Sequence, residues 1–194
     1  GGDFYNSGKG WSPIGTDSSS SFSGTFDGNG YAIKNLYINI NSSSSVCAGL
    51  FGYSAGTIEN LGMIDSDISV SVSSGSYSYV GGIAGRVDGS VVNCYNTGNI
   101  SSYSDFSNYG SSAKFYAYAG GIVGAALGTV KNCYNTGNVS ANDNLGPAYP
   151  SAGGIVGVVL LGPGSITDCY NTGNISAKRN AGGILGGRTG TGIV

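Results

Sequence analysis

Residues 93–99 read Asn-Cys-Tyr-Asn-Thr-Gly-Asn, and the same phrase recurs at 132–138 and, with one change, at 168–174. A Gly-Gly-Ile-x-Gly block precedes each copy, at 81–85, 120–124 and 153–157, and a fourth block lies at 182–186. Self-similarity at such a period is typical of a stack of one structural unit, because no unit buries its apolar side alone. The sequence therefore predicts a repeat architecture.

A shorter pattern accompanies the phrase: an apolar residue, any residue, Asn or Asp, then Leu or Cys. It begins at Ile33, Ile58, Val91, Val130 and Ile166, in steps of 25, 33, 39 and 36 residues. Asn and Asp tolerate left-handed backbone angles, so they suit a bend between short strands. Because the pattern is constant while its spacing varies, the extra residues are expected to leave as side loops at fixed corners.

Such units stack as parallel strands about 4.8 Å apart, and parallel crossovers are overwhelmingly right-handed. The predicted fold is all-β: a right-handed single-stranded parallel β-helix, or β-solenoid, of about five to six coils with side loops. The alternative is a β-sandwich, but a sandwich gives no reason for one phrase to recur at the same point of each unit.

The whole chain, 1–194, is expected to form a single β-solenoid segment excised from a longer protein, because it stops inside a repeat. Residues 1–32 differ from the repeats and form an N-terminal lead-in. Trp11 and Phe22 within it are candidates to cover the open end of the core, since stacked strands end in unpaired backbone groups.

The blocks at 49–52, 82–85, 121–124 and 154–157, together with the lead-in Phe-Ser-Gly-Thr-Phe-Asp-Gly-Asn-Gly at 22–30, resemble GLUG repeats from about Trp11 onward. The resemblance implies a secreted or surface protein of bacteria, such as an adhesin-like protein or a non-catalytic region of an immunoglobulin A peptidase. It does not imply protease activity, because the His-Glu-x-x-His zinc site of such peptidases needs histidine and this chain has none.

Composition excludes several classes of function. The net charge is −2, so no broad positive field is available to hold nucleic acid. The absence of histidine removes the commonest general base and the commonest metal ligand. The most apolar stretch, 152–161, is too short to span a bilayer, so we expect no direct membrane insertion. We also expect no catalytic residue, no cofactor and no metal site.

Two sets of equivalent residues are expected to form structural columns. Stacked cysteines would hold their Cβ atoms nearly 5 Å apart, wider than the mean of about 3.8 Å in a disulfide. A column of reduced, buried thiols is therefore favoured over disulfides, with Cys47 outside it. The polar set, to which Asn96, Asn135 and Asn171 belong as a second column, is expected to satisfy backbone amides at corners and to pair between coils rather than bind a ligand. The members are Cys94, Cys133 and Cys169, and Asn93, Asn132 and Asp168.

The segment 102–118 interrupts the repeat and is rich in aromatic residues. These offer stiff contact area for sugar rings or protein partners. The alternative is that they cover an outward apolar strip formed by Phe51, Ala84, Val123, Val156 and Leu185. The candidate ligand-binding residues are Tyr103, Phe106, Tyr109, Phe115, Tyr116 and Tyr118.

Other candidate features have simpler explanations. Asp65 and Asp67 could serve a glycosidase or calcium, but the pair does not recur in later units and is expected to be a solvated edge. Arg86 and Asp88 are the nearest match to the charged groove of polysaccharide-cleaving β-helices. A column of Thr97, Thr136 and Thr172 could form an ice-binding face, which would need a second threonine column.

These observations predict a non-enzymatic scaffold or adhesive segment of a bacterial cell-surface or secreted protein. It would present loops to a host protein or glycan and adjoin other domains of the parent chain. The expected location is extracellular or at the bacterial surface. The alternative is a fragment of a polysaccharide-active β-helix enzyme, a lyase or hydrolase.

Overall fold

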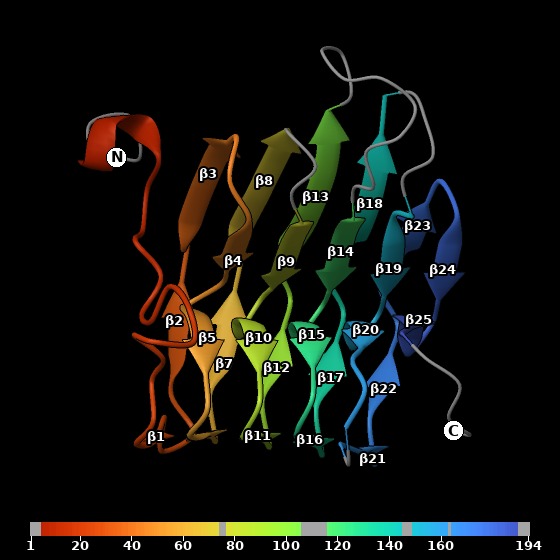
Figure 1. The fold of residues 1–194 in the computed structure, drawn as a ribbon. Coiled ribbons are helices and arrows are strands. Elements are labelled where there is room, and N and C mark those ends of the chain that lie inside the picture. Colours follow the sequence, from red (N-terminus) through yellow and green to blue (C-terminus); the bar gives the residue numbers. More distant parts are fainter. Residues whose placement is uncertain (1–4, 74–76, 106–115, 145–148, 163, 190–194) are drawn as a thin grey trace.

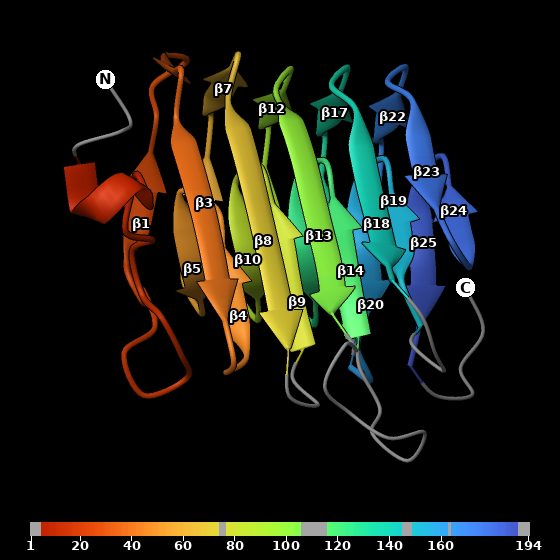
Figure 2. The same cartoon turned by 90° about the horizontal axis from the view of Figure 1, so that it is seen from above.

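The structure is a computed structural model that describes residues 5–73, 77–105, 116–144, 149–162 and 164–189. A short 3-10 helix, η1 (Tyr5–Gly8), precedes an array of strands. The strands form five parallel sheets of five strands each, and the chain adds one strand to every sheet in turn before it starts the next coil. From β1 to β25 it winds to the right as it advances (Figure 1 and Figure 2). The predicted right-handed parallel β-solenoid is confirmed.

The first two sheets consist of short strands. Sheet 1 contains β1 (Thr25–Asp27), β6 (Thr57–Glu59), β11 (Ser90–Val92), β16 (Thr129–Lys131) and β21 (Ile166–Thr167). Sheet 2 contains β2 (Ala32–Lys34), β7 (Gly62–Ile64), β12 (Tyr95–Asn96), β17 (Tyr134–Asn135) and β22 (Tyr170–Asn171).

The other three sheets complete each coil. Sheet 3 contains β3 (Tyr37–Ser42), β8 (Asp67–Ser73), β13 (Asn99–Asp105), β18 (Val139–Asp143) and β23 (Ile175–Ala177). Sheet 4 contains β4 (Val46–Ala48), β9 (Tyr77–Gly81), β14 (Tyr116–Gly120), β19 (Ser151–Gly153) and β24 (Asn180–Gly182). Sheet 5 contains β5 (Phe51–Ser54), β10 (Ala84–Val87), β15 (Val123–Ala126), β20 (Val156–Val159) and β25 (Leu185–Arg188).

The coil count is slightly lower than the predicted five to six. The path from β1 to β21 makes four complete turns, and β22 to β25 carry the chain through most of another. All strand pairs within the five sheets are parallel, so equivalent residues of successive coils lie in columns along the axis.

The corner between sheets 1 and 2 is built by the repeated Asn or Asp. Asn60, Asn93, Asn132 and Asp168 all have left-handed backbone angles, with φ between 53° and 55°. Short polar side chains adopt this conformation more readily than other residues, because they hydrogen-bond locally. The bend expected from the sequence pattern is therefore present in four consecutive coils.

The first step of the predicted pattern is wrong. Ile33 pairs with Met63, not with Ile58, whose partner in the first coil is Phe26. Asn35 instead stands beside Asp65 at the next corner, between sheets 2 and 3, where both residues have positive φ. Asn or Asp occurs at two different corners of the coil. The sequence pattern therefore treated residues from both corners as equivalent.

The main core runs through the interior of the stack, and one expectation about it is wrong. Phe51, Ala84, Val123 and Val156 are fully buried in this core and do not form an outward strip. The inward residues before them, such as Ile83, lie in the same core. Both can point inward because the chain bends at this point from sheet 4 into sheet 5.

Residues of the lead-in lie against the first coil. The Trp11 indole Nε1 donates a hydrogen bond to the Leu50 carbonyl oxygen at 3.0 Å. The Phe22 ring packs on Phe51 with 4.9 Å between centroids, and a parallel bridge joins Ile14 to Phe51. These contacts cover apolar side chains at the N-terminal end of the core (left in Figure 1).

The connections between sheets 3 and 4 differ in length from coil to coil, and the connection from β20 to β21, between sheets 5 and 1, is also longer than its equivalents. Of those between sheets 3 and 4, one joins β8 to β9, another joins β13 to β14, and a third joins β18 to β19. Because these strands stay in register on both sides, the insertions change the repeat length without disturbing the stack. This agrees with the expectation that extra residues leave at fixed corners.

Candidate functional site

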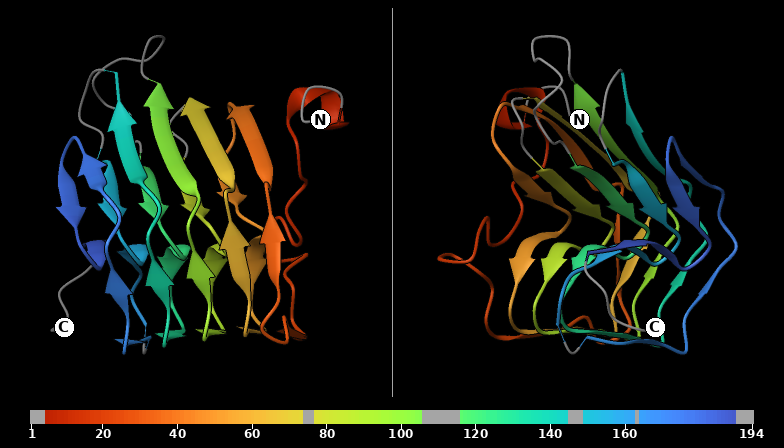
Figure 3. Two further views of the ribbon diagram at one scale, coloured as in Figure 1. Left: turned by 180° about the vertical axis from the view of Figure 1, so that it is seen from behind. Right: turned by 45° about the vertical axis from the view of Figure 1, so that its right-hand side comes forward.

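On the outside of the solenoid, sheets 4 and 5 meet at a re-entrant angle (Figure 3, right). Two hollows and a second apolar cluster are formed by the side chains on these outer faces. The second glycine of each Gly-x-x-Gly block makes this angle possible. A Cβ atom on Gly124 would lie 2.3 Å from the Val80 nitrogen, and one on Gly85 would lie 2.4 Å from the Ala48 nitrogen. Backbone therefore touches backbone across the angle, and only glycine leaves room for that.

Two facing columns of side chains line this surface, which we call the tyrosine groove. They point out of the solenoid, opposite to the main core, and a second apolar cluster joins the two columns. The column on sheet 4 is Cys47, Tyr79, Tyr118, Ser151 and Asn180. The column on sheet 5 is Tyr53, Arg86, Ala125, Val158 and Gly187.

The tyrosine rings of sheet 4 stack on one another. The ring centroids of Tyr79 and Tyr118 are 5.6 Å apart, and those of Tyr116 and Tyr118 are 5.8 Å apart, with nearly parallel planes. Tyr149 continues this stack beside Tyr116 at 6.0 Å. Burial raises the pKa of Tyr79 to about 12, so its hydroxyl stays protonated at neutral pH. The groove thus presents aromatic surface with hydroxyl groups.

At its N-terminal end the groove holds a hollow of about 250 Å³, with Tyr53 and Arg86 in its wall. The Arg86 Nε donates to Asp88 Oδ1 at 2.9 Å, and the Tyr53 hydroxyl donates to Asp88 Oδ2 at 2.6 Å. The guanidinium also lies over the Tyr53 ring, 4.8 Å from its centroid. Burial, with the hydrogen bond to Asp88, raises the pKa of Tyr53 to about 12. The charges of Arg86 and Asp88 therefore neutralise each other.

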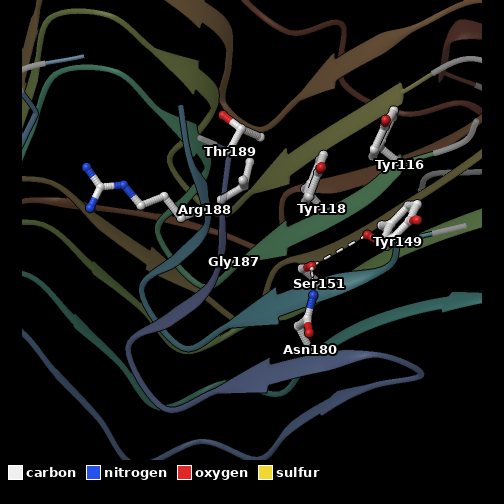
Figure 4. A pocket seen from close by; sticks show the side chains of 9 residues that line it. Tyr116, Tyr118, Tyr149, Ser151, Asn180, Gly187, Arg188 and Thr189 are labelled. Carbon is white, nitrogen blue, oxygen red and sulfur yellow. Dashed lines mark hydrogen bonds between the residues drawn. The ribbon is translucent and has the colours of Figure 1, made fainter. Parts of the chain in front are cut away.

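A second hollow of about 250 Å³ lies toward the C-terminal end (Figure 4). The rings of Tyr116, Tyr118 and Tyr149 form one wall, while Ser151 and Asn180 supply polar groups. Its other lining residues are Val158, Gly187, Arg188 and Thr189. The Arg188 side chain points away from the tyrosine rings (Figure 4). The lining combines stacked rings with hydroxyl and amide groups.

The structure brings together only some of the residues of the predicted aromatic ligand site. Tyr116 and Tyr118 lie in the tyrosine groove, whereas Tyr103 belongs to β13 of sheet 3 and does not line either hollow. Phe106, Tyr109 and Phe115 lie outside the described residues. Whether these residues bind a ligand stays a prediction.

Sequence reasoning missed Tyr79 and Tyr149. The signal for the groove was available in one respect: Tyr79 and Tyr118 both stand two residues before a Gly-Gly pair. Sequence reasoning also missed a second row of stacked tyrosine rings, which lies on sheet 2. Tyr95, Tyr134 and Tyr170 stack with centroids 5.0 and 5.1 Å apart and planes within 5°.

The three cysteines that share a repeat position hold one column of the core. Their thiols are free, and each donates to a backbone carbonyl, as Cys133 Sγ does to Lys131 O at 3.2 Å. Cys94 and Cys133 are buried, whereas Cys169 in the last coil is half-buried. Cys47 lies in the tyrosine groove, where burial raises its pKa to about 12, so its thiol is protonated at neutral pH.

The predicted polar column consists of side chains bonded to one another. Asn132 Nδ2 donates to Asn93 Oδ1 at 3.1 Å, and Asn93 Nδ2 donates to Asn60 Oδ1 at 3.0 Å. Asp168 ends the column, with its carboxylate 4.0 Å from the Lys131 ammonium. Asp65 and Asp67 are exposed, the former at the corner described above.

Within the residues that the structure describes, no group of three or more His, Cys, Asp or Glu side chains is arranged to hold a metal ion. In the same part of the chain, no helix has the length and apolar character to cross a membrane.

Comparison with known proteins agrees with the repeat geometry. The family model described as the GLUG motif matches residues 76–101, 116–140 and 148–176. Each match contains one Gly-Gly-Ile-x-Gly block with the strands around it. No curated protein and no solved structure matches the chain. Its repeats and its parallel β-solenoid fit a non-catalytic repeat scaffold, and the chain is a GLUG-repeat protein.

Proposed function

We propose that this chain is a non-enzymatic, adhesive scaffold of a bacterial cell-surface or secreted protein, and that it binds a host glycan or protein. The observation that carries the proposal is the tyrosine groove. Aromatic rings with polar edges, placed in a row along a rigid support, suit the alternating apolar and hydroxylated surfaces of glycans.

The scaffold half of the proposal rests on the stack itself. Each coil contacts only its neighbours, so the length of the solenoid sets the distance that it bridges. Connections of different length precede the sheet 4 strands of successive coils, and these strands nevertheless keep their register. The sequence of these connections can therefore vary without altering the core.

Two features favour binding over catalysis. The chain contains no histidine, and the two carboxylates at the N-terminal hollow are both held by hydrogen bonds: Asp88 by Arg86 and the Tyr53 hydroxyl, and Asp17 by Ser19 and Ser20. The competing idea is a polysaccharide lyase or hydrolase. Incubation with pectin-like, alginate-like and mucin glycans, with and without calcium, tests it directly: release of any cleaved product would refute the non-enzymatic part of the proposal.

A glycan array and a pull-down with host matrix proteins test the adhesive part. Tyr77 and Tyr149, which are 39% and 41% exposed at the two hollows, are replaced by Ser. The control is Tyr31→Ser, since Tyr31 is 74% exposed and lines neither hollow. Binding is expected to fall in the two groove variants and to persist in the control. No binding by the unaltered chain would leave only a spacer role.

A further inference from the structure

The ladder of tyrosines on sheet 4 breaks at one place. Going along the axis, its outward column reads Tyr79 and Tyr118, and then changes to Ser151. Across the groove, the side chain in the sheet 5 column becomes smaller, from Val158 to Gly187 in the neighbouring coil. Two side chains become small on facing walls at nearly the same height, and the hollow of about 250 Å³ lies there.

The size of this hollow follows from the missing ring. Tyr79 and Tyr118 stack at 5.6 Å between centroids, so a flat ring placed next in the row would occupy the space above Ser151. Pockets for drug-sized ligands measure roughly 300–1,000 Å³, which makes this hollow suitable for a single ring rather than a larger molecule. Gly187 does not obstruct the space, because its position carries no side chain (Figure 4).

The polar groups beside the tyrosine rings of the hollow are uncharged, because Arg188, the one charged residue in its lining, points away from the rings (Figure 4). Asn180 Nδ2 donates to Ser151 Oγ at 3.1 Å, and Ser151 Oγ lies 3.5 Å from the Tyr149 carbonyl oxygen. These hydroxyl, amide and carbonyl groups lie along one side of the hollow, beside the rings of Tyr116 and Tyr118 (Figure 4). Such a lining matches a ring with apolar faces and hydroxylated edges better than a purely apolar ring.

We propose that this hollow is a subsite for one pyranose unit of a neutral glycan, and that the sugar ring takes the next position in the tyrosine ladder. Its C–H face packs on the tyrosine wall and its hydroxyl groups exchange hydrogen bonds with Ser151 and Asn180. The proposal deepens the adhesive function proposed above and rests on it. A protein partner is disfavoured for this hollow, because standard protein interfaces bury about 800 Å² per partner.

Two substitutions fill the hollow with side chains that other coils already carry at equivalent positions. Ser151→Tyr continues the column of Tyr79 and Tyr118, and Gly187→Val repeats the neighbouring Val158. A Cβ atom on Gly187 meets only Ser151 closely, at 3.1 Å from its Oγ, and the backbone there does not require positive φ. Gly187→Val therefore tests the idea even where the larger replacement perturbs the fold.

The control is Asn142→Tyr. Asn142 is exposed on sheet 3 and pairs in register with Tyr103, so that surface already accommodates a tyrosine in the preceding coil. This variant adds the same ring to the chain without touching the tyrosine groove.

The experiment is saturation-transfer NMR and titration of the full chain with three probes: methyl β-D-glucopyranoside, the methyl glycoside of N-acetylglucosamine, and glucuronic acid as the charged counterpart. A neutral glycoside is expected to bind with a Kd of about 1–10 mM, as a single ring in a shallow site would. Both filling variants should weaken binding at least tenfold, while Asn142→Tyr should leave it unchanged.

Each other outcome refutes the subsite. Equal binding by the filled variants would place the sugar elsewhere and would leave the adhesive function intact. Preference for glucuronic acid would overturn the neutral class of ligand. If no glycoside binds while the glycan array is positive, the subsite is wrong and the proposed function stands; if the array is also blank, both fail.

Discussion

Asparagine side chains form several hydrogen-bonded rows along the solenoid, and two of these rows differ in what holds them in place. In the buried row, Asn96 and Asn135 are fully enclosed, and Asn96 Nδ2 donates to Asn135 Oδ1 at 2.8 Å. In the corner row, Asn93 and Asn132 are exposed and bond at 3.1 Å. The repeated phrase contains one residue of each row, three positions apart, and only their surroundings separate them.

The buried row is fixed by its side chains. Asn135 Nδ2 donates both to Gly137 O and to Asn171 Oδ1, each at 2.8 Å, so both amide hydrogens are used. The corner row is fixed by its backbone, since Asn132 has a φ of 53°. A buried polar group is costly when it loses a partner, whereas an exposed one exchanges that partner for water. The two rows should therefore respond differently to the same substitution.

The largest difference is expected from a carboxyl group placed in each row. In Asn135→Asp, an oxygen replaces Nδ2 and faces two acceptors, Gly137 O and Asn171 Oδ1. Burial and these acceptors raise the pKa of the introduced carboxyl by about 3 units or more, which corresponds to about 4 kcal/mol. Asn132→Asp should change the free energy of unfolding by less than about 1 kcal/mol, because Asp168 already occupies that position in the last coil.

The sign follows from proton linkage. Above pH 3.9 the carboxyl ionises in the unfolded chain before it does so in the folded one, so stability falls as pH rises toward the folded pKa. Asn135→Asp should thus be mildly destabilised below about pH 4, where the neutral carboxyl has one hydrogen for two acceptors, and strongly destabilised at pH 7. Chemical unfolding followed by circular dichroism at both pH values measures this. An equal pH profile for the two variants would contradict the distinction between the rows.

Asn135→Ala is expected to cost about 3 kcal/mol, because it leaves a small cavity and removes the partners of two buried groups. Asn96 Nδ2 would lose its acceptor, and Asn171 Oδ1 would lose its donor. Thermal unfolding gives the comparison. A cost below about 1 kcal/mol would show that water enters the row and replaces the lost bonds.

The glycine that faces the buried row is the next test. A Cβ atom on Gly121 would lie 2.4 Å from Asn135 Cγ and 2.2 Å from Gly154 O, so Gly121→Ala should cost about 2 kcal/mol through overpacking. Gly183 holds the same motif position in the last coil, and its Cβ would meet nothing within 4 Å. Gly183→Ala is therefore the matched control and should be neutral or slightly stabilising. Equal destabilisation of both would point to backbone conformation as the cause.

The smallest effect is expected at the corner row. Asn132→Ala should lower the free energy of unfolding by about 1 kcal/mol, because alanine adopts the left-handed backbone conformation unfavourably and has no polar side chain that hydrogen-bonds locally. Asn132→Gly should be closer to the original protein, since glycine adopts this φ freely. Parallel urea titrations rank the two. If glycine proved no better than alanine, the hydrogen bond to Asn93, which both variants lose, and not the backbone angle, would govern this position.

Much of the fold could be predicted because residues at the same position of the repeated phrase occupy the same position in successive coils. The register of Asn93 with Asn132, and of the cysteines beside them, follows from identity alone. The register of the first coil could not be obtained this way. Asn35 and Asn60 occupy similar local patterns at different corners. Only the strand pairing distinguishes the two patterns, because Ile33 pairs with Met63 whereas Ile58 pairs with Phe26.

The candidate site was harder to predict than the fold. An alternating pattern assigns Ala84 and Val123 to the outside, but the chain bends between sheets 4 and 5, and both residues turn into the core. The groove depends on that bend, since it brings Tyr118 and Val158 together from different coils. The second glycine of each Gly-x-x-Gly block permits this angle, but its presence alone does not predict that the two sheets bend toward each other.

The single tryptophan lies at the N-terminal end of the solenoid, while fourteen tyrosines are distributed through the chain. The Trp11 indole donates to the Leu50 carbonyl oxygen and the Trp11 backbone nitrogen donates to Tyr37 O, so the first coil sets the surroundings of this side chain. Indole fluorescence therefore reports unfolding of the N-terminal end of the stack, whereas tyrosine absorbance averages over the whole chain.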